Sequence, residues 1–402
     1  MGARLRKRAR DLARDDRRYL GRSGDPDDLE ITSAEGCRVT DARGRTYIDF
    51  QMGWCVGNLG WNHPAIVERL RRFDGPSYVS PKALYAPWVE LARQLAAVAP
   101  GRLERCWRAV GGTEAVELAL QLAMAYTGRG KLVTIEGAYH GNSVAAKSVG
   151  DPGRLPHPLA GCKKLAPPLD AGAVGRLETL LAHDDVAAFV LEPIVVNLGI
   201  EIPSHELMRG AAALCRQHGT LLVADEVACG FGRTGAMFAC EHYGLEPDIM
   251  TVGKAITSGH APLGAAITTA EIADAVRGDF EFYSTFGWHP LAVEAALATL
   301  ELFAREGDAL LDNAAERSRQ IVSRLSGMAW PEARSHPAEI RVKGLAIAVR
   351  VGDHAAEIAR RCRAGGLLLG DEDDLLLMFP ALTVDEATVA AALDVVEGAL
   401  VA

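Results

Sequence analysis

Lysine is scarce in this chain of 402 residues. Lysine and arginine together number 43, and only eight of these residues are lysines. One of them, Lys254, directly follows the apolar run 249–253. A lysine that leaves a buried strand is costly unless its charge is paired or removed, and a neutral amine can attack a carbonyl carbon to form a Schiff base. The commoner arrangement extends the ammonium into solvent, so Lys254 alone does not decide the function.

Other absences exclude whole classes of protein. The eight cysteines are scattered without a C-x-x-C pair, which predicts reduced thiols rather than a disulfide framework or a zinc site. No uninterrupted apolar run reaches about 18 residues, so no membrane span is expected. The net charge of −9 gives no general attraction to nucleic acid. We therefore expect a cytoplasmic protein with no metal site and with neither membrane nor nucleic acid as a partner.

The first residues are an exception to the acidic balance. Apolar residues at helical spacing predict an amphipathic helix, and the missing apolar core argues against a secretory signal. A nucleic-acid or membrane arm is an alternative, but Asp11, Asp15 and Asp16 interrupt the positive charge and favour a solvated helix. The basic residues concerned are Arg4, Arg6, Lys7, Arg8, Arg10, Arg14, Arg17 and Arg18.

Strand-like runs alternate with helical patterns through the middle of the chain. This alternation predicts an α/β fold in which helices cover both faces of a mixed, mostly parallel sheet. In such sheets the ligand site lies beyond the carboxyl ends of the strands. Unusual residues fall there, namely 136–141, Glu192, Asp225 and Lys254. The predicted strands are 131–136, 187–192, 220–225, 249–252 and 264–268, and the predicted helices are 114–126, 175–182 and 206–218.

The pattern changes after Pro290. Helical patterns cover 290–306 and 311–327, and shorter strand and helix patterns then continue to residue 400, which predicts a smaller α+β domain. A hairpin signal at 36–50 is expected to pack with that domain. We therefore expect an N-terminal segment, a large cofactor-binding domain and a small C-terminal domain, with the bounds 1–50, 51–295 and 296–402.

A glycine-rich helix start follows the strand-like run 106–110. Glycine allows the backbone to approach an anion, and the free amides of a helix N-terminus bind phosphate. Thr113, directly after Gly112, adds a hydroxyl that can also cap the helix. Taken alone, these residues are explained better by an ordinary helix start.

Two further motifs stand at predicted strand ends. In Tyr139-His140-Gly141 the aromatic ring can lie flat on a planar ligand, although a tyrosine in a turn is the simpler alternative. Asp225 ends an apolar strand, where a buried carboxylate needs a cation. That cation is either a protonated pyridine nitrogen, which we favour, or an arginine such as Arg233.

Together these parts meet the needs of pyridoxal 5'-phosphate. They provide an amine for a Schiff base, a phosphate cradle, a stacking aromatic ring and an acid for the pyridine nitrogen. The acid keeps the ring nitrogen protonated, so that the ring can accept electrons from the substrate. The displaced lysine can then move a proton between substrate and cofactor carbons.

The order and spacing of these motifs resemble those of the class III (ω-type) aminotransferases, a family of fold-type I pyridoxal phosphate enzymes. The similarity runs from about Gly36 to Val384 and includes Gly57–Pro64, Gly112–Ala115, Tyr139–Gly141, Glu192-Pro193, Asp225–Val227, Gly230–Gly235, Pro247–Ile249 and Gly253-Lys254. The resemblance implies that Lys254 and Asp225 are catalytic. It also implies a homodimer with shared active sites, in which Thr285 reaches the phosphate bound to the neighbouring subunit. The implied cofactor-binding residues are Gly112, Thr113, Tyr139, His140, Glu192, Asp225, Val227, Lys254 and Thr285.

Several positions depart from the family pattern. Ala228 replaces a glutamine that contacts the ring hydroxyl, and Leu377 and Asn197 replace an arginine and a glutamate. A bidentate arginine is the usual ligand of a carboxylate, so we expect no tight recognition of a simple α-carboxylate there. The substrate-pocket candidates are Trp54, Tyr85, Asn197 and Trp288, of which the aromatic ones could equally be core or dimer contacts.

The expected function is amino transfer from an amino acid to an aldehyde or ketone of a specialised metabolite, by a ping-pong mechanism. Both substrates would be small molecules, and the product a sugar, peptide or amine. The segment 125–129 and Asn197 also resemble the branch that contains glutamate-1-semialdehyde aminomutase and aminosugar aminotransferases. An aminomutase or epimerase is therefore one alternative, and a non-catalytic pyridoxal phosphate-binding regulatory protein is a second.

Overall fold

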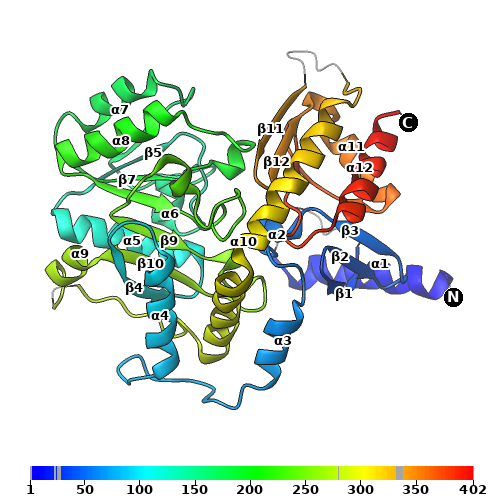
Figure 1. The fold of residues 1–402 in the computed structure, drawn as a ribbon, viewed down its shortest axis with the longest axis horizontal. Coiled ribbons are helices and arrows are strands. Elements are labelled where there is room, and N and C mark those ends of the chain that lie inside the picture. The colour runs from blue at the N-terminus through cyan, green and yellow to red at the C-terminus, as the bar shows by residue number, and fades with distance from the viewer. Residues whose placement is uncertain (1, 22–23, 25–28, 279, 332–337, 402) are drawn as a thin grey trace.

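The computed structural model in Figure 1 describes residues 2–21, 24, 29–278, 280–331 and 338–401, and side chains from residue 11 onward. The predicted N-terminal helix is present as α1 (Gly2–Tyr19). The side chains of Arg4 to Arg10 lie outside the described residues, so the alternatives for this basic segment stay predictions. Among the described residues, no helix combines the length and the apolar character needed to cross a membrane.

A seven-stranded sheet forms the larger part of the molecule. Only β10 opposes its neighbours, because it pairs antiparallel with β4 and β9 while every other pair is parallel. The predicted mixed, mostly parallel sheet is therefore confirmed. In spatial order the strands are β4 (Leu103–Ala109), β10 (Gly264–Thr269), β9 (Ile249–Val252), β8 (Leu221–Asp225), β7 (Val186–Leu191), β5 (Lys131–Ile135) and β6 (Cys162–Leu165).

Alternate residues of the central strands point to opposite faces of this sheet. Val190 and Val223 pack on the side of α5, whereas Phe189 and Leu222 belong to a second core that includes α7 and α8. The prediction of helices on both faces is confirmed, because both sets of residues are buried. The helices around the sheet are α4 (Ala86–Val98), α5 (Gly112–Thr127), α6 (Val144–Val149), α7 (Ala173–Leu181), α8 (His205–His218) and α9 (Ala270–Ala275).

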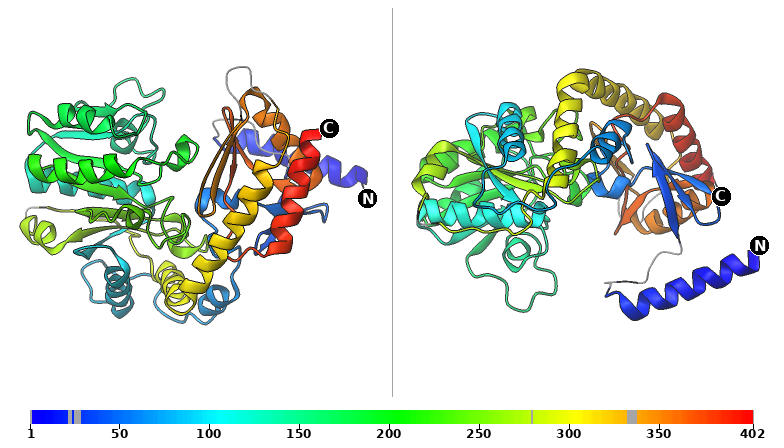
Figure 2. Two further views of the ribbon diagram at one scale, coloured as in Figure 1. Left: turned by 45° about the horizontal axis from the view of Figure 1, so that its top comes forward. Right: turned by 90° about the horizontal axis from the view of Figure 1, so that it is seen from below.

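A single long helix, α10 (Pro290–Ser326), replaces the two predicted helices. The prediction of a break between residues 306 and 311 was wrong. Gly307 costs only about 1 kcal/mol inside a helix, and buried residues on both sides of it, including Phe303 and Leu310, hold the helix together. Figure 2 shows α10 running from the large sheet to the C-terminal sheet.

The C-terminal part contains a four-stranded antiparallel sheet with helices beside it. The strands in spatial order are β11 (Glu339–Lys343), β12 (Ala346–Arg350), β15 (Leu375–Met378) and β14 (Gly370–Glu372). The helices are α11 (Ala355–Gly365) and α12 (Glu386–Val401). A smaller α+β unit is thus present in the C-terminal part.

The N-terminal hairpin joins this part through backbone pairing. β13 (Leu367–Leu368) pairs parallel with β3 (Thr46–Asp49), which continues a sheet with β2 (Arg38–Asp41) and β1 (Ile31–Glu35). The three domain bounds stay a prediction, and α10 crosses the one expected at 295–296. The remaining helices are α2 (Met52–Cys55), α3 (Pro64–Arg71), η1 (Val196–Leu198), η2 (Ala239–Tyr243), η3 (Lys254–Thr257) and η4 (Gly352–His354).

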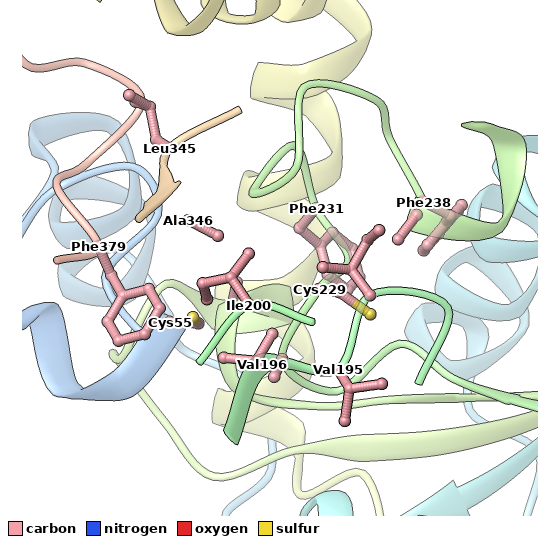
Figure 3. Packing of buried hydrophobic residues seen from close by; sticks show 14 of the residues in the cluster. Cys55, Val195, Val196, Ile200, Cys229, Phe231, Phe238, Leu345, Ala346 and Phe379 are labelled. Atoms are coloured by element: carbon pink, nitrogen blue, oxygen red, sulfur yellow. The ribbon is translucent and has the colours of Figure 1, made fainter. Parts of the chain in front are cut away.

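An apolar cluster lies where the large sheet meets the C-terminal sheet (Figure 3). Val196 and Ile200 come from the segment after β7, and Phe231 comes from the segment after β8. They belong to the same buried core as Leu345, directly before β12, and Phe379, directly after β15. This packing fixes the segments that surround the carboxyl edge of the large sheet.

Candidate active site

A cavity of about 430 Å³ lies at that edge. Three neighbouring strands lead into it, because Glu192 follows β7, Asp225 ends β8 and Lys254 comes two residues after β9. Most of the predicted site residues therefore lie together. The cavity is lined by Trp54, Gly112, Thr113, Tyr139, His140, Gly141, Glu192, Val196, Asn197, Asp225, Val227, Ala228, Lys254 and Glu372.

Lys254 sits at an unusual point of the backbone. It opens the short helix η3 with a φ of +41°, a left-handed conformation that a side chain disfavours. The preceding Gly253 is close to the start of α5, where an added Cβ would lie 3.1 Å from the backbone nitrogen of Gly112. Such strain concentrates at functional sites and requires surrounding structure to hold it. The bend leaves Lys254 on the cavity wall rather than in a strand.

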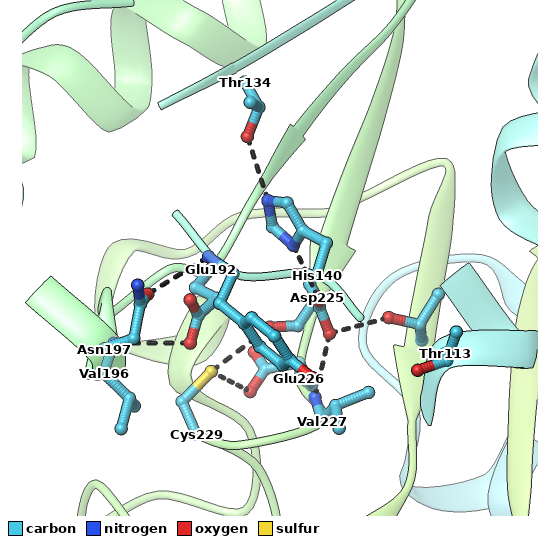
Figure 4. A network of polar contacts seen from close by, with 12 residues as sticks. Thr113, Thr134, His140, Glu192, Val196, Asn197, Asp225, Glu226, Val227 and Cys229 are labelled. Atoms are coloured by element: carbon cyan, nitrogen blue, oxygen red, sulfur yellow. Dashed lines mark hydrogen bonds and ion pairs between the residues drawn. The ribbon is translucent and has the colours of Figure 1, made fainter. Parts of the chain in front are cut away.

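Asp225 is held by hydrogen bonds to both of its carboxylate oxygens (Figure 4). Its Oδ2 lies 2.7 Å from Nδ1 of His140, and its Oδ1 accepts from the hydroxyl of Thr251 at 2.9 Å and from the amide of Val227 at 3.2 Å. The residue is 3% exposed. The carboxylate is therefore fixed in orientation before any ligand binds.

The alternative partner for Asp225 bonds elsewhere. The guanidinium of Arg233 donates to the carbonyl oxygens of Leu345 and Pro380 and to the side chain of Asn58. Arg233 thus ties the segment after β8 to the C-terminal part. Its use in this network leaves the cavity side of Asp225 free for a different cation.

Two supporting hydroxyls were missed by the sequence analysis. Thr134 lies in β5 and its Oγ1 is 2.9 Å from Nε2 of His140, so that Thr134, His140 and Asp225 form a chain of contacts. Thr251 lies in β9 and bonds Asp225 directly. Each is the only hydroxyl-bearing residue of its short apolar strand, and that isolated polar position was the available signal.

The start of α5 faces the same cavity with free donors. Gly111, at the N-cap, has no side chain to satisfy the first amides, which have no acceptor inside the helix. Gly112 packs closely against Val227, since an added Cβ would lie 2.6 Å from its Cγ1. Gly141 has a φ of +127° and would place a Cβ 2.6 Å from the hydroxyl of Thr113. These glycines bring three segments together around a helix terminus, the kind of place where free amides can bind an anion.

Glu192 is the buried acid of the cavity. It is 3% exposed, and burial, together with the negative charge of Asp225, raises its pKa to about 8. Oε2 accepts from the amide of Val196 at 3.3 Å, whereas Oε1 accepts from no group of the described residues. A neutral acid in this place can donate a hydrogen bond to a ligand. Ala228, which lines the same cavity, has no polar side-chain group that could bind a ligand.

Glu226 has a different role from its neighbour Asp225. It turns away from the cavity and accepts from the amides of Ala239 and Cys240 at 2.9 and 2.8 Å and from the thiol of Cys229. Burial raises the pKa of the Glu226 carboxyl. Asp225 therefore lines the cavity, whereas Glu226 holds the loop that follows β8.

Asn197 fastens the loop that carries Tyr139. Its Oδ1 accepts from the amide of Tyr139 at 3.2 Å, and its Nδ2 donates to the carbonyl of Gly137 at 2.8 Å. Tyr139 remains 47% exposed on the cavity wall, and its hydroxyl accepts from Asn142 at 2.9 Å. The aromatic face is thus supported from one side and open toward the cavity.

The substrate-pocket candidates separate in the structure. Trp54 and Asn197 line the cavity, whereas Tyr85 lines another hollow near α3 and α10. Trp288 is 2% exposed, and its ring donates to the carbonyl of Gly264 at 2.9 Å, which makes it a core residue of this chain. Thr285 is exposed and does not line this chain's cavity.

One cavity residue carried no functional signal in the sequence. Glu372 lies in the acidic run 371–374, a pattern typical of a solvated turn. Its place on the cavity wall follows only from the pairing of β14 with β15. No group of three or more potential metal ligands occurs among the described side chains.

Known proteins are similar to this chain in sequence and in architecture. The acetylornithine aminotransferase of Archaeoglobus fulgidus is 35% identical over 91% of this chain and 94% of its own. The [LysW]-aminoadipate semialdehyde transaminase of Deinococcus radiodurans is 33% identical over 82% of this chain and 75% of its own. An amine transaminase from an uncultivated Pseudomonas species, solved in its pyridoxal phosphate-bound form, superposes with a TM-score of 0.86 at 27% identity and covers 95% of this chain and 97% of that one.

The family assignment rests on almost the whole chain. The sequence model named aminotransferase class-III matches residues 19–400. The fold is that of fold-type I enzymes, and the predicted cofactor, pyridoxal 5'-phosphate, is confirmed by the family and by the solved relatives. The chain belongs to the class III aminotransferases.

Proposed function

We propose that this aminotransferase passes an amino group from an amino acid to an aldehyde or ketone of a specialised metabolite, a sugar, a peptide or an amine precursor, by a ping-pong mechanism. The single observation that carries the proposal is the shared cavity of Lys254, Asp225 and the α5 terminus, whose substrate side has no arginine among its described lining residues. The names of the two relatives above indicate different substrates, so the residues of the cavity wall are the better guide to the substrate class.

The residues present suit pyridoxal phosphate. The open amides and hydroxyl at Gly112 and Thr113 suit its phosphate, and the fixed carboxylate of Asp225 suits a protonated pyridine nitrogen. Tyr139 offers a ring face, and Val227 supplies an apolar contact on the same wall. When bound, the cofactor supplies a carbonyl carbon for the amine and a ring that accepts electrons.

Lys254 has a proposed task in proton transfer, and Asp225 and His140 have proposed tasks in positioning. The amine of Lys254 would hold the cofactor between turnovers, and the free amine would carry a proton to and from the substrate carbon. Asp225 keeps its charge directed into the cavity because His140 and Thr251 hold its two oxygens. His140 acts through Asp225 and is a positioning residue.

Glu192 is proposed to replace a missing contact. Many family members carry a glutamine at the position of Ala228, and an amide there can donate to the ring hydroxyl. The raised pKa of Glu192 keeps it neutral near pH 7, so its carboxylic acid can donate instead. Its unpartnered Oε1 lies on the cavity wall and supports this role.

The substrate side of the cavity lacks the usual carboxylate ligand. Leu377, at the place of the family's arginine, is fully buried in β15, and Asn197 is engaged with the Tyr139 loop. Neither residue can bind a carboxylate by a bidentate ion pair. The proposed acceptor is therefore not a plain α-keto acid.

We also propose a homodimer with shared active sites. Thr285 is exposed, and the neighbouring Ser284 bonds Glu114 of α5 at 3.1 Å, which places this segment beside the phosphate-type helix terminus. Exposed aromatic residues accompany it, namely Tyr78, Tyr283 and Phe286. Such a patch suits burial against a second copy of the chain. The proposed location is the cytoplasm, as the scattered cysteines indicate.

A two-part assay tests the proposed function. Holoenzyme is first mixed with single amines, and loss of the visible absorbance of the bound cofactor reports the first half of the reaction. Aldehydes and ketones are then added to measure recovery. Efficient conversion of ornithine with 2-oxoglutarate, together with no reaction of carboxylate-free amines, would overturn the proposed substrate class. Conversion of one amino compound without any carbonyl acceptor would instead favour an aminomutase or epimerase.

A further inference from the structure

We propose that Glu372 binds a second positively charged group at the far end of the substrate, so that the preferred amines are diamines or other amines with a second cationic group. This inference rests on the proposed function, since it names the class of amine that the same cavity accepts. In a ping-pong reaction the acceptor and the amine made from it share this site.

The pairing of β14 with β15 directs Glu372 toward the cavity. Gly370 and Glu372 lie on the same face of β14, because side chains alternate along a strand. On that face, a Cβ added at Gly370 would lie 3.4 Å from the ring of Trp54. Trp54 and Glu372 both line the cavity, so this face of the C-terminal sheet forms its outer wall.

The neighbouring acid points the other way. Asp371 lines a separate hollow beside α11, together with Arg360 and Arg363. The acidic run 371–374 therefore does not act as one patch. Glu372 is its only member on the cavity wall among the described residues.

Among the described residues that line the cavity, none offers a free cation to Glu372. The described lining residues include no arginine, and their one lysine, Lys254, is assigned to the cofactor. Leu377, paired with Gly370, and Leu375, paired with Glu372, supply only apolar surface beside it. Partial burial and the nearby charge of Asp373 raise the pKa of the Glu372 carboxyl. A cationic group on the substrate would relieve both effects.

A second carboxyl oxygen of the cavity, at the edge of the large sheet, also lacks a partner. Oε1 of Glu192, on a residue that is 3% exposed, receives no hydrogen bond from the described residues. Of the three acidic residues that line the cavity, Glu192 and Asp225 are assigned to the cofactor, and Glu372 is the one left for the substrate. Its charge attracts a positively charged group and repels a distal carboxylate.

Three amines of equal chain length provide the test. Butane-1,4-diamine, butylamine and 4-aminobutanoate differ only in the far end, which is positive, neutral or negative. Each is mixed with holoenzyme, and the rate of loss of the cofactor's visible absorbance is measured against amine concentration. The variants are Glu372→Gln and, as a matched control with the same change of charge, Asp371→Asn.

In the wild type, the second-order rate constant is expected to be highest for the diamine, lower for butylamine and lowest for 4-aminobutanoate. Glu372→Gln should lower the second-order rate constant for the diamine by roughly tenfold, as loss of a charge-assisted contact implies, and leave butylamine within about twofold. Asp371→Asn should preserve the order. Glu372→Lys should reverse it in favour of 4-aminobutanoate, which a general loss of folding cannot produce.

The outcomes separate the two proposals. Equal rates for diamine and butylamine in the wild type, or an unchanged ratio in Glu372→Gln, would overturn the role of Glu372 while amine transfer stands. Reaction with none of the amines, together with rapid reaction of α-amino acids alone, would overturn the proposed substrate class itself.

Discussion

Nδ1 of His140 lies 2.7 Å from Oδ2 of Asp225, and both side chains are buried at the carboxyl edge of the large sheet. The far side of the imidazole contacts Thr134 of β5. The orientation of the acid on β8 therefore depends on a hydroxyl two strands away in the sheet.

Replacement of His140 should disturb the orientation of Asp225. His140→Asn should lower kcat by roughly tenfold to a hundredfold, because Asp225 loses the group that fixes one of its oxygens. Thr134→Val, one contact farther away, should have a smaller effect. Steady-state kinetics with a spectrum of the bound cofactor separates orientation from loss of binding. An unchanged kcat and spectrum in His140→Asn would contradict the positioning role.

Replacement of Lys254 should remove turnover. Lys254→Ala is expected to lower kcat by about a thousandfold or more, because the amine has no substitute on the cavity wall. Borohydride treatment followed by intact-mass measurement should attach the cofactor to the wild type and not to the variant. Lys164→Ala, at a lysine remote from the cavity, serves as the control. Attachment in Lys254→Ala would assign the reactive amine to another residue.

Two adjacent glycines give a matched test of the proposed phosphate site. Gly112→Ala should weaken cofactor binding by roughly tenfold, because the new Cβ would lie 2.6 Å from Val227 and must displace the helix start. Gly111→Ala has open space around the added Cβ and should stay within about threefold. Titration of cofactor-free protein measures both. Equal losses in the two variants would argue against a close-packed cradle at Gly112.

Burial of Glu192 predicts a pH dependence of stability. The unfolded chain releases this proton near pH 4.5, whereas the folded chain keeps it until the pH reaches about 8. Between these values the folded state binds more protons, so the free energy of unfolding falls as the pH rises. Urea unfolding of cofactor-free Glu192→Gln should show a weaker fall. The exposed Glu136→Gln should follow the wild type, and identical curves for all three would contradict a neutral Glu192.

The proposed dimer predicts a link between assembly and cofactor binding. Phe286→Asp places a charge in the exposed aromatic patch and should shift the protein toward monomer in sedimentation velocity. Because Thr285 is proposed to reach the partner's phosphate, cofactor affinity should fall in parallel. Ile202→Asp, at an exposed apolar residue before α8, is the control. A wild-type monomer with full cofactor affinity would contradict shared sites.

The large sheet and most of the site could be predicted because their signals are local. Apolar strands that end in Asp225 or before Lys254 indicate a ligand edge without any knowledge of the partner strands. The edge strand β6 was missed because its two lysines weaken the apolar pattern. The single helix α10 was missed because the burial that stabilises both halves comes from distant segments.

The missed site residues depend on long-range pairing. Thr251 bonds an acid 26 positions earlier, and Glu372 reaches the cavity only through its strand partner Leu375. Tyr85 and Trp288 illustrate the opposite case, since an aromatic residue near a motif gives no information about which hollow it lines. Sequence patterns thus indicate which strand ends carry chemistry, and tertiary contacts decide what lies opposite them.

The continuity of α10 limits how the chain can be divided. A cut after residue 295 would sever this helix within its second turn and expose Leu297, Leu300 and Phe303, which are buried in the intact chain. Fragments produced separately at that point would present these apolar side chains to solvent and would tend to aggregate. The catalytic portion therefore cannot be shortened to a minimal enzyme at this position, and any split version of the protein needs its junction in an exposed loop.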